Sequence, residues 1–334
     1  MSNEENRLTS AEIGNLWMAY VNNTATICFL KHAIKIVEDD EIKLVIDKGL
    51  QLAEDYISSI KTIFQKDNYA VPQGFLDQDV NINAPRLFSD IFHLNFVKSL
   101  SKVGIGTYGM CYSMGTRDDV RALFLKCLNT STDLDEHATK VLLKKGLYVR
   151  PPYITVPDKV RFVKKDSFLS GFFTNRRQLT ALEITHLFMN LDTNMLGQVV
   201  MIGFGQVAEA KELRELFWKG HTIAHSHAQT FSRKLEEDNL PSSSPWDSGV
   251  TKSQVAPFSD KLMAFLATFL CAAGIGNYGM ALGASPRHDI GAMYSKLMME
   301  SGLFANRFAE YLIKNGWMEE PPQSENREEL VRGH

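Results

Sequence analysis

The sequence predicts an all-α protein made of two copies of one four-helix bundle, and three observations carry that prediction. Residues 8–13 (LTSAEI) return as residues 179–184 (LTALEI), at an offset of 171 residues that holds as far as Asn68 and Asn239. Apolar residues recur at helical spacing in nearly every long segment. Each copy is about 145 residues long, which is the size of a domain rather than of a solenoid repeat.

A second block of matches fixes the domain boundaries. After one deletion the offset is 170 residues, and residues 104–110 (GIGTYGM) match residues 274–280 (GIGNYGM). Both copies close on a glycine followed by a double proline, at residues 151–152 and 321–322. We therefore predict a first bundle at 8–150, a linker at 151–178, a second bundle at 179–322 and a flexible tail at 323–334.

Four helices are expected in each copy. The apolar stripes place them at residues 10–37, 41–66, 87–114 and 117–145, and at 181–208, 212–236, 257–284 and 286–315. Thr116 with Asp119, and Ser285 before Pro286, are expected to cap the fourth helix of each copy. The predicted connections are a short turn, a long crossover rich in proline, and another short turn. This is the connectivity of a ferritin-like four-helix bundle.

The composition agrees with two ordinary globular domains and excludes several function classes. Hydrophobic residues make up 44% of the chain and the net charge is −3, so we expect no basic surface for nucleic acid. The polar N-terminus lacks the apolar core of a secretion signal, and the four cysteines share no paired spacing. We therefore expect a cytoplasmic protein in a reducing compartment, without structural disulfides.

The linker differs in character from the bundles. Residues 153–156 and 160–163 are short β-type runs around a Pro-Asp-Lys turn, and they could pair as a small hairpin. Basic and aromatic residues follow, among them Phe168 and Phe173. Such a segment can bind membrane surfaces or phosphates. We favour an ordered linker whose aromatic side chains pack between the two bundles.

The glycine motif of each copy matches the Gly-x-Gly-x-x-Gly dinucleotide-binding fingerprint in letters only. That fingerprint requires a strand before the glycines and a helix N-terminus after them to hold the phosphate. Here the glycines fall late in an apolar helical run, so we expect no nucleotide cofactor. We interpret them as packing residues that let a neighbouring helix backbone approach closely. These glycines are Gly104, Gly106, Gly109, Gly274, Gly276 and Gly279.

One segment has the length and composition of a membrane-spanning helix. Residues 262–284 carry no charge and are long enough to cross a bilayer. The matching stretch of the first copy contains His93, Lys98 and Lys102, which a spanning helix would not accommodate. Because two copies of one fold should not differ in crossing a membrane, we predict a buried central helix and no transmembrane segment.

Four residues of the second copy suggest a site for a single divalent metal ion. His221 and His225, at i and i+4, share one face of a helix and could bind one ion. Asp192 lies level with them on the preceding helix, and His186 lies further along it. The third and fourth helices supply no Glu-x-x-His pair for a di-iron centre, and the first copy lacks the histidine pair. His227 instead matches a tyrosine of the first copy and suits a buried, hydrogen-bonded ring.

The repeated motifs resemble those of a known family. The glycine motif and the closing Lys-x-Gly-[Leu/Trp]-x-x-x-Pro-Pro segments, residues 144–152 and 314–322, are similar to domain of unknown function 3231. That family has tandem copies and occurs in spore-forming Gram-positive bacteria. Single bundles of this kind resemble the spore coat protein F group, which is placed among ferritin-like folds. The resemblance covers residues 8–322 and implies the fold, but it brings no catalytic or binding residues.

These observations leave three functions open. The leading interpretation is a non-catalytic, soluble protein of sporulation or the spore coat that acts as a homo-oligomer or with protein partners, using the glycine-rich third helices as packing seams. The first alternative is a metal-binding protein or metal-dependent oxidoreductase that uses the histidines of the second copy. The second alternative is a binder of a small apolar ligand, held in a bundle core that is widened beside residues 274–279.

Overall fold

The computed structural model describes residues 7–172, 176–242 and 249–332, and these residues form long helices joined by turns and extended segments. The first copy contains α1 (Ser10–Ile36), α2 (Asp40–Lys66), α3 (Asp90–Met114) and α4 (Asp118–Lys144). The second contains α5 (Ala181–Val207), α6 (Lys211–Glu236), α7 (Asp260–Ala284) and α8 (His288–Lys314). Two short 3-10 turns, η1 (Asp77–Asp79) and η2 (Asp166–Leu169), and helix α9 (Arg327–Arg332) complete the described structure. The predicted all-α duplication is confirmed.

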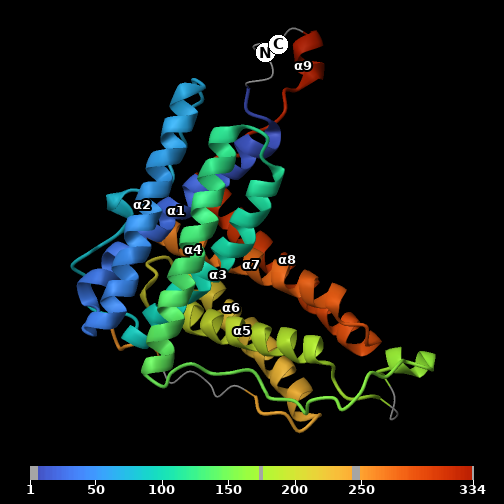
Figure 1. The fold of residues 1–334 in the computed structure, drawn as a ribbon. Coiled ribbons are helices and arrows are strands. Elements are labelled where there is room, and N and C mark those ends of the chain that lie inside the picture. The colour runs from blue at the N-terminus through green and yellow to red at the C-terminus, as the bar shows by residue number, and fades with distance from the viewer. Residues whose placement is uncertain (1–6, 173–175, 243–248, 333–334) are drawn as a thin grey trace.

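The two bundles form the arms of a V that meet at one end (Figure 1). In the first arm α1 packs on α2 and α3 packs on α4; in the second arm α5 packs on α6 and α7 packs on α8. Short turns connect each of these pairs, and a long crossover joins the second helix of each copy to the third. The predicted order of two hairpins around one crossover is therefore observed in both copies.

The junction of the arms has an approximate two-fold symmetry that follows from the duplication. Val80 pairs with Phe258 in one isolated antiparallel bridge, and Phe88 pairs with Val250 in the other. Val80 and Val250 occupy the same position of the two copies, and so do Phe88 and Phe258, so the two bridges are equivalent. Backbone hydrogen bonds of 2.8 to 2.9 Å flank both bridges. Each crossover therefore binds the start of the third helix of the other copy, in the self-complementary manner of a homodimer interface.

The hydrophobic core is continuous across the junction. Phe258 of the second copy stacks on Phe29 of the first, with ring centroids 5.1 Å apart. Phe88 of the first copy lies 6.0 Å from Phe204 of the second. Gly203 makes room for the Phe88 ring, because a Cβ there would lie 2.4 Å from it. One large cluster thus spans both copies at the junction, and each arm has a smaller cluster further out.

A histidine without polar contacts lies in this shared core. His93 is 1% exposed, and its ring centroid lies 5.6 Å from that of Phe29 and 5.5 Å from that of Phe92. Neither ring nitrogen has a hydrogen-bond partner among the described residues. Burial lowers the pKa of His93 to about 3, with smaller effects from the charges of His32 and Arg86. The ring is therefore neutral in the folded protein at neutral pH.

Replacing His93 with methionine, the residue found at the matching position 263, is expected to reduce the acid sensitivity of the fold. A histidine pKa below its ordinary value near 6.5 means that the unfolded chain binds the additional proton. The stability that depends on neutral His93 is therefore complete above about pH 6.5, and it is lost as the pH falls toward about 3. Urea unfolding at several pH values between about 7 and 4 should show a shallower decline for His93→Met. Equal slopes in the two proteins would contradict this account.

At the outer end of each bundle, a buried glutamate joins the starts of the first and fourth helices by hydrogen bonds. Glu12 closes a capping box with Thr9 at the start of α1. Its other oxygen accepts hydrogen bonds of 2.8 Å from the backbone N–H groups of Thr116 and Arg117, at the start of α4. The predicted capping of α4 by Thr116 and Asp119 is therefore wrong, because Glu12 satisfies these amides and Asp119 pairs with Arg117 instead. In the second copy Glu183 closes the matching capping box and accepts one backbone hydrogen bond, of 3.3 Å, from the N–H of Arg287 just before α8, because Pro286 at the position of Thr116 has no N–H.

The segments outside the bundles differ from expectation. The proposed hairpin does not form, since residues 151–163 contain no strand. Val156, Val160 and Phe162 are each more than 80% exposed, and an isolated pair of such short strands buries too little surface to be stable. Phe173 lies outside the described residues. The tail, expected to be flexible, includes the exposed helix α9.

Candidate functional site

The histidine pair expected to bind a metal lies at the surface of the second bundle. His221 and His225 stack on successive turns of α6, with ring centroids 6.2 Å apart. Both rings contact Gln198 of α5: His221 Nδ1 lies 3.4 Å from its carbonyl oxygen, and His225 Nδ1 lies 3.0 Å from its Oε1. Trp218 stacks on His221 at 5.4 Å. The pair therefore makes polar contacts across the seam between α5 and α6.

Asp192 and His186 do not join this pair. Burial lowers the pKa of His186, and the charge of Lys102 on α3 adds to this effect. Asp192 also interacts electrostatically with Lys102. Among the residues that the structure describes, no three Asp, Glu, His or Cys side chains converge in a way that could hold a metal ion. The predicted metal site of His221 and His225 with Asp192 or His186 is therefore not assembled.

A row of polar side chains crosses the core of the second bundle, with one residue from each helix. The Tyr278 hydroxyl lies 2.8 Å from Asn194 Nδ2 and 3.0 Å from His227 Nδ1. His227 Nε2 lies 3.2 Å from Glu300 Oε2. Tyr278 and His227 are 2% and 1% exposed, whereas Glu300 reaches the surface. Burial lowers the pKa of His227 in spite of the opposing effect of Glu300. The expected buried, hydrogen-bonded ring at position 227 is confirmed.

The first bundle carries the same row with different side chains. Asn23 Nδ2 donates to the Tyr108 hydroxyl at 3.0 Å. Tyr56 takes the place of the histidine, with its ring edge-on to Tyr108 at a centroid distance of 5.6 Å. Its hydroxyl bonds to Thr130, which takes the place of the glutamate. Burial raises the pKa of Tyr56 to about 12, so this row is uncharged at neutral pH.

Each of these rows takes one side chain from each of the four helices of its bundle. In metal-containing four-helix bundles, the core positions where four helices face one another carry inward-facing glutamates and Glu-x-x-His pairs. Here the side chains hydrogen-bond within each row, although the proton of the Tyr108 hydroxyl in the first row has no acceptor among the described residues. A buried hydrogen-bonded network helps to fix the register of the helices that contribute to it. The rows therefore act as structural elements of both bundles.

The glycine clusters are not sites of close backbone contact, contrary to the interpretation from the sequence. At Gly104 there is little space for a side chain, because a Cβ added there would lie 2.8 Å from Ser131 Oγ. At Gly109 and Gly279 an added Cβ would make only ordinary contacts, at 4.0 and 3.8 Å. Elsewhere α3 and α7 are open at these glycines. The positions at which an added Cβ would meet no atom within 4 Å are Gly106, Gly274 and Gly276.

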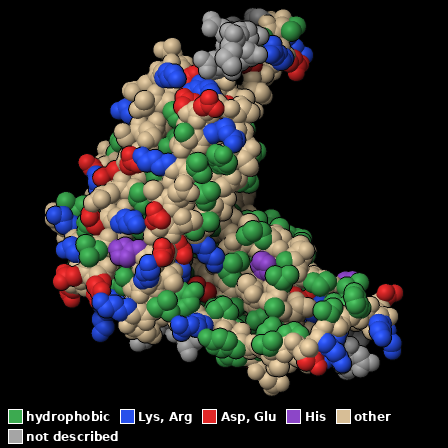
Figure 2. Space-filling model, viewed as in Figure 1, with side chains coloured by type: hydrophobic (Ala, Val, Ile, Leu, Met, Phe, Trp, Pro, Cys, Tyr) green, Lys and Arg blue, Asp and Glu red, His purple; other side chains and the backbone are tan. Residues whose placement is uncertain are grey.

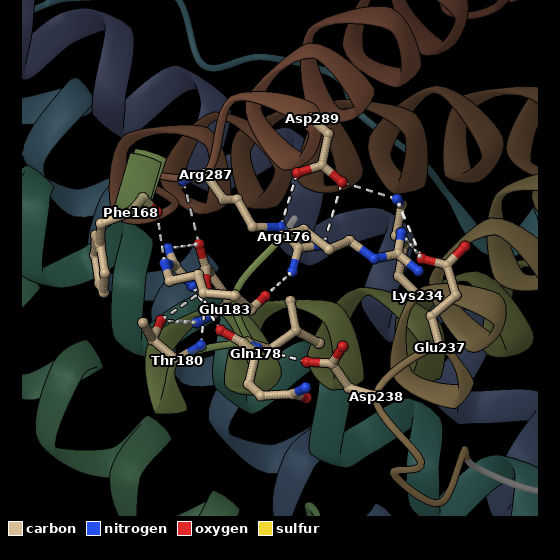
Figure 3. A network of polar contacts seen from close by, with 12 residues as sticks. Phe168, Arg176, Gln178, Thr180, Glu183, Lys234, Glu237, Asp238, Arg287 and Asp289 are labelled. Carbon is tan, nitrogen blue, oxygen red and sulfur yellow. Dashed lines mark hydrogen bonds and ion pairs between the residues drawn. The ribbon is translucent and has the colours of Figure 1, made fainter. Parts of the chain in front are cut away.

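Charged residues form a dense network at the outer end of the second bundle (Figure 3). Glu183 is completely buried and accepts hydrogen bonds of 2.7 and 2.9 Å from the guanidinium of Arg177. Arg287 is 1% exposed, and its Nε donates to Asp289 at 2.7 Å. Lys234 donates to the other oxygen of Asp289 at 2.9 Å. The buried charges of this end are thus paired with one another.

The end of the linker docks on this network. The ring of Phe168 lies 4.1 Å from the guanidinium carbon of Arg177, and its carbonyl accepts from Arg177 Nε at 2.8 Å. Gly171 packs on Asp289 so closely that an added Cβ would lie 1.8 Å from Oδ1. Phe162, which was expected to pack between the bundles, is 82% exposed. The network therefore anchors the linker to the second bundle only through its last residues.

The first bundle contains a cavity beside its polar row. Its volume is about 90 Å³, and it is lined by helices α1 to α4 and by Phe269 of α7. The wall is mainly apolar; Asn23, Tyr108 and Ser131 form one polar end, and further uncharged polar residues, among them Thr26 and Thr107, also line the cavity. A cavity of this size costs about 2 kcal/mol of stability at ~24 cal/mol per Å³. The widened core was expected beside residues 274–279, but this cavity lies beside Gly104 of the first copy.

Two bundles with a shared core, each crossed by a row of hydrogen-bonded polar side chains, define a duplicated all-helical protein. The chain belongs to the family described as "Protein of unknown function (DUF3231)", which matches residues 1–160 and 167–330. The resemblance seen in the sequence is thereby confirmed, with one family unit on each copy.

Comparison with other proteins adds little beyond the family. No curated protein matches the chain. A solved structure from Bacillus halodurans C-125, provisionally described as a spore coat protein, is 17% identical with a TM-score of 0.41. The match covers 46% of this chain and 100% of that chain.

Proposed function

We propose that this chain is a non-catalytic, cytoplasmic and spore-associated protein that acts through self-association. The open faces of α3 and α7 would be its contact surfaces. The spore association rests on the resemblance of its motifs to the spore coat protein F group. The polar rows and the separated histidines offer no ligand set that would favour the metal-dependent alternative.

The open face of α7 is the observation that supports self-association most directly. By length and composition α7 could cross a membrane, yet only 33% of its most apolar window is buried in the molecule. Its first half lies in the shared core, with Leu262 and Leu266 buried. Its second half exposes Gly276 and 59% of Met280. An exposed apolar helix face of this kind is typical of a protein contact site.

The duplication supplies a second face of the same type. On α3, Gly106 is exposed and Met110 is 56% exposed, at the positions that match Gly276 and Met280. Hydrophobic side chains are exposed on both arms, including the surfaces on either side of the notch between them (Figure 2). With two related faces a chain could bind two neighbours at once. That arrangement suits an extended assembly.

Light scattering after size-exclusion chromatography tests the proposal. The unmodified protein is expected to be a dimer or larger at micromolar concentration. Gly276→Arg should weaken its association at least tenfold, because a long charged side chain would stand on the contact face. Gly302→Arg on α8 is the matched control, since a Cβ there also meets open space. A monomeric unmodified protein, or equal effects of the two substitutions, would contradict self-association through this face.

A further inference from the structure

We infer that the first bundle binds a small neutral amphiphile, a short-chain alcohol or ketone, in the cavity between α1, α2, α3 and α4. The volume of about 90 Å³ corresponds to about three water molecules or about five non-hydrogen atoms of an organic ligand. None of the described residues that line the cavity is charged, so a charged ligand would have no counter-ion. The mainly apolar wall and its uncharged polar groups define the chemical class.

The second copy shows that the same scaffold can fill this space. At the cavity wall a Cβ on Gly49 would lie 3.4 Å from Leu30 and 3.6 Å from Leu134. At the matching glycine of the second copy, Gly220, an added Cβ would lie 2.8 Å from both the Met201 sulfur and the Phe304 ring. The space is therefore not imposed by the backbone of the bundle. The first copy has the shorter, branched Leu30 in place of Met201 and the smaller Leu134 in place of Phe304.

The polar end of the cavity carries a hydrogen-bond donor that is not used within the chain. The Tyr108 hydroxyl accepts from Asn23 at 3.0 Å, and its own proton has no acceptor among the described residues. In the second copy the matching Tyr278 hydroxyl donates to Asn194 Oδ1 at 3.0 Å. The free donor of Tyr108 suits the oxygen of an alcohol or a carbonyl. The Ser131 hydroxyl lies at the same end and can donate or accept.

The cavity also involves the other copy. Phe269 of α7 is half-buried and forms part of the wall, although the remaining lining residues belong to the first bundle. A bound molecule would therefore contact both arms of the V near the junction. The first copy thus combines an uncharged polar row with a cavity in its core.

Titration with 1-butanol, followed by ligand-observed NMR on the full-length protein, tests the inference. The unmodified protein should bind in the millimolar range. The double variant Leu30→Met/Leu134→Phe, which copies the residues of the second bundle, should weaken binding at least tenfold. The reverse change in the second bundle, Met201→Leu/Phe304→Leu, is the matched control and should leave the affinity of the first-bundle site unchanged. No binding by the unmodified protein, or unchanged binding by the filled variant, would overturn the inference.

A second variant keeps the test decisive if the filled variant does not fold. Tyr108→Phe preserves the shape of the cavity and removes the donor. It should weaken 1-butanol at least fivefold and leave the affinity for n-pentane, which has the same number of non-hydrogen atoms, unchanged. Equal loss of both ligands, or of neither, would show that Tyr108 does not recognise the ligand and would overturn the amphiphile assignment.

Discussion

Replacing Glu183 with alanine is expected to destabilise the protein by about 3–5 kcal/mol, because it removes the counter-ion of the largely buried Arg177 guanidinium and leaves several donors without their carboxylate acceptor. The carboxylate is completely buried and accepts hydrogen bonds from the Arg177 guanidinium, from Thr180 and from the backbone N–H of Arg287, just before α8. Urea unfolding at pH 7 measures the loss. Glu215→Ala is the matched control: that side chain is 70% exposed and its ion pair is 3.9 Å long, so the change should cost less than about 0.5 kcal/mol.

The pH dependence of the two buried carboxylates provides an independent check. Burial alone would raise the pKa of Glu12, but hydrogen bonds from Thr9, Arg117 and Thr116 outweigh it and lower the pKa to about 2. A carboxyl pKa that is lower in the folded chain stabilises the fold fully above about pH 4.5, and this contribution is lost as the pH falls toward about 2. Burial alone would also raise the pKa of Glu183, but hydrogen bonds from Arg177 and Thr180 outweigh it and lower that pKa, so Glu183→Gln should flatten the acid limb of the stability curve. A loss below about 1 kcal/mol for Glu183→Ala would show that these carboxylates do not hold the helices together.

The helices could be predicted from the sequence because their apolar spacing is local. The hydrogen bonds of the buried glutamates at the ends of the bundles could not be predicted, because their partners are far apart along the chain. Glu12 accepts from the amides of Thr116 and Arg117, which lie more than 100 residues away. Local rules assign the cap of α4 to Thr116 and Asp119, and that assignment fails because a long-range acceptor is already present.

The candidate site was only partly predictable for a related reason. The match of His227 with Tyr56 correctly indicated a buried ring. Asn194 and Glu300, which complete the row, were missed because spacing within one helix does not show which residues of four helices share a level. The repeat itself held a signal, since Asn23 and Asn194 occupy the same position of the two copies. The spacing of His221 and His225 suggested a metal site, but their rings contact Gln198 instead.

The shared core could not be predicted from the repeat. Two similar sequences in tandem suggest two independent domains, and each copy has the length of one. The contacts between the copies are made by the crossovers, by the starts of α3 and α7, and by residues of α1 and α5 such as Phe29 and Phe204, and apolar spacing within one helix does not show which of these residues meet. Gly203 and Phe88 interlock across the junction although they lie in different copies. The exchange of crossovers makes the folded chain resemble a fused homodimer.

Replacing Phe258 with alanine should therefore destabilise both copies together, by about 3–5 kcal/mol. The side chain is 3% exposed. It stacks on Phe29 at 5.1 Å, lies edge-on to His32 at 5.5 Å and contacts Phe204 at 6.0 Å. Truncation removes contacts with both copies and leaves a cavity at the point where they meet. Leu303→Ala, at a position that is 69% exposed, is the control and should change the free energy of unfolding by less than about 0.5 kcal/mol.

Calorimetry distinguishes this shared core from two independent bundles. If the core couples the copies, the unmodified protein unfolds in one transition, and Phe258→Ala lowers its midpoint by several degrees without splitting it. If each bundle folds alone, the substitution should shift only the transition of the second copy, because Phe258 belongs to that copy in sequence. Phe88→Ala, the same position in the first copy, should then shift only the other transition. Matching effects of the two substitutions on a single transition require a core that belongs to both copies, whereas separate effects would mean that the stacking of Phe258 on Phe29 contributes little to stability.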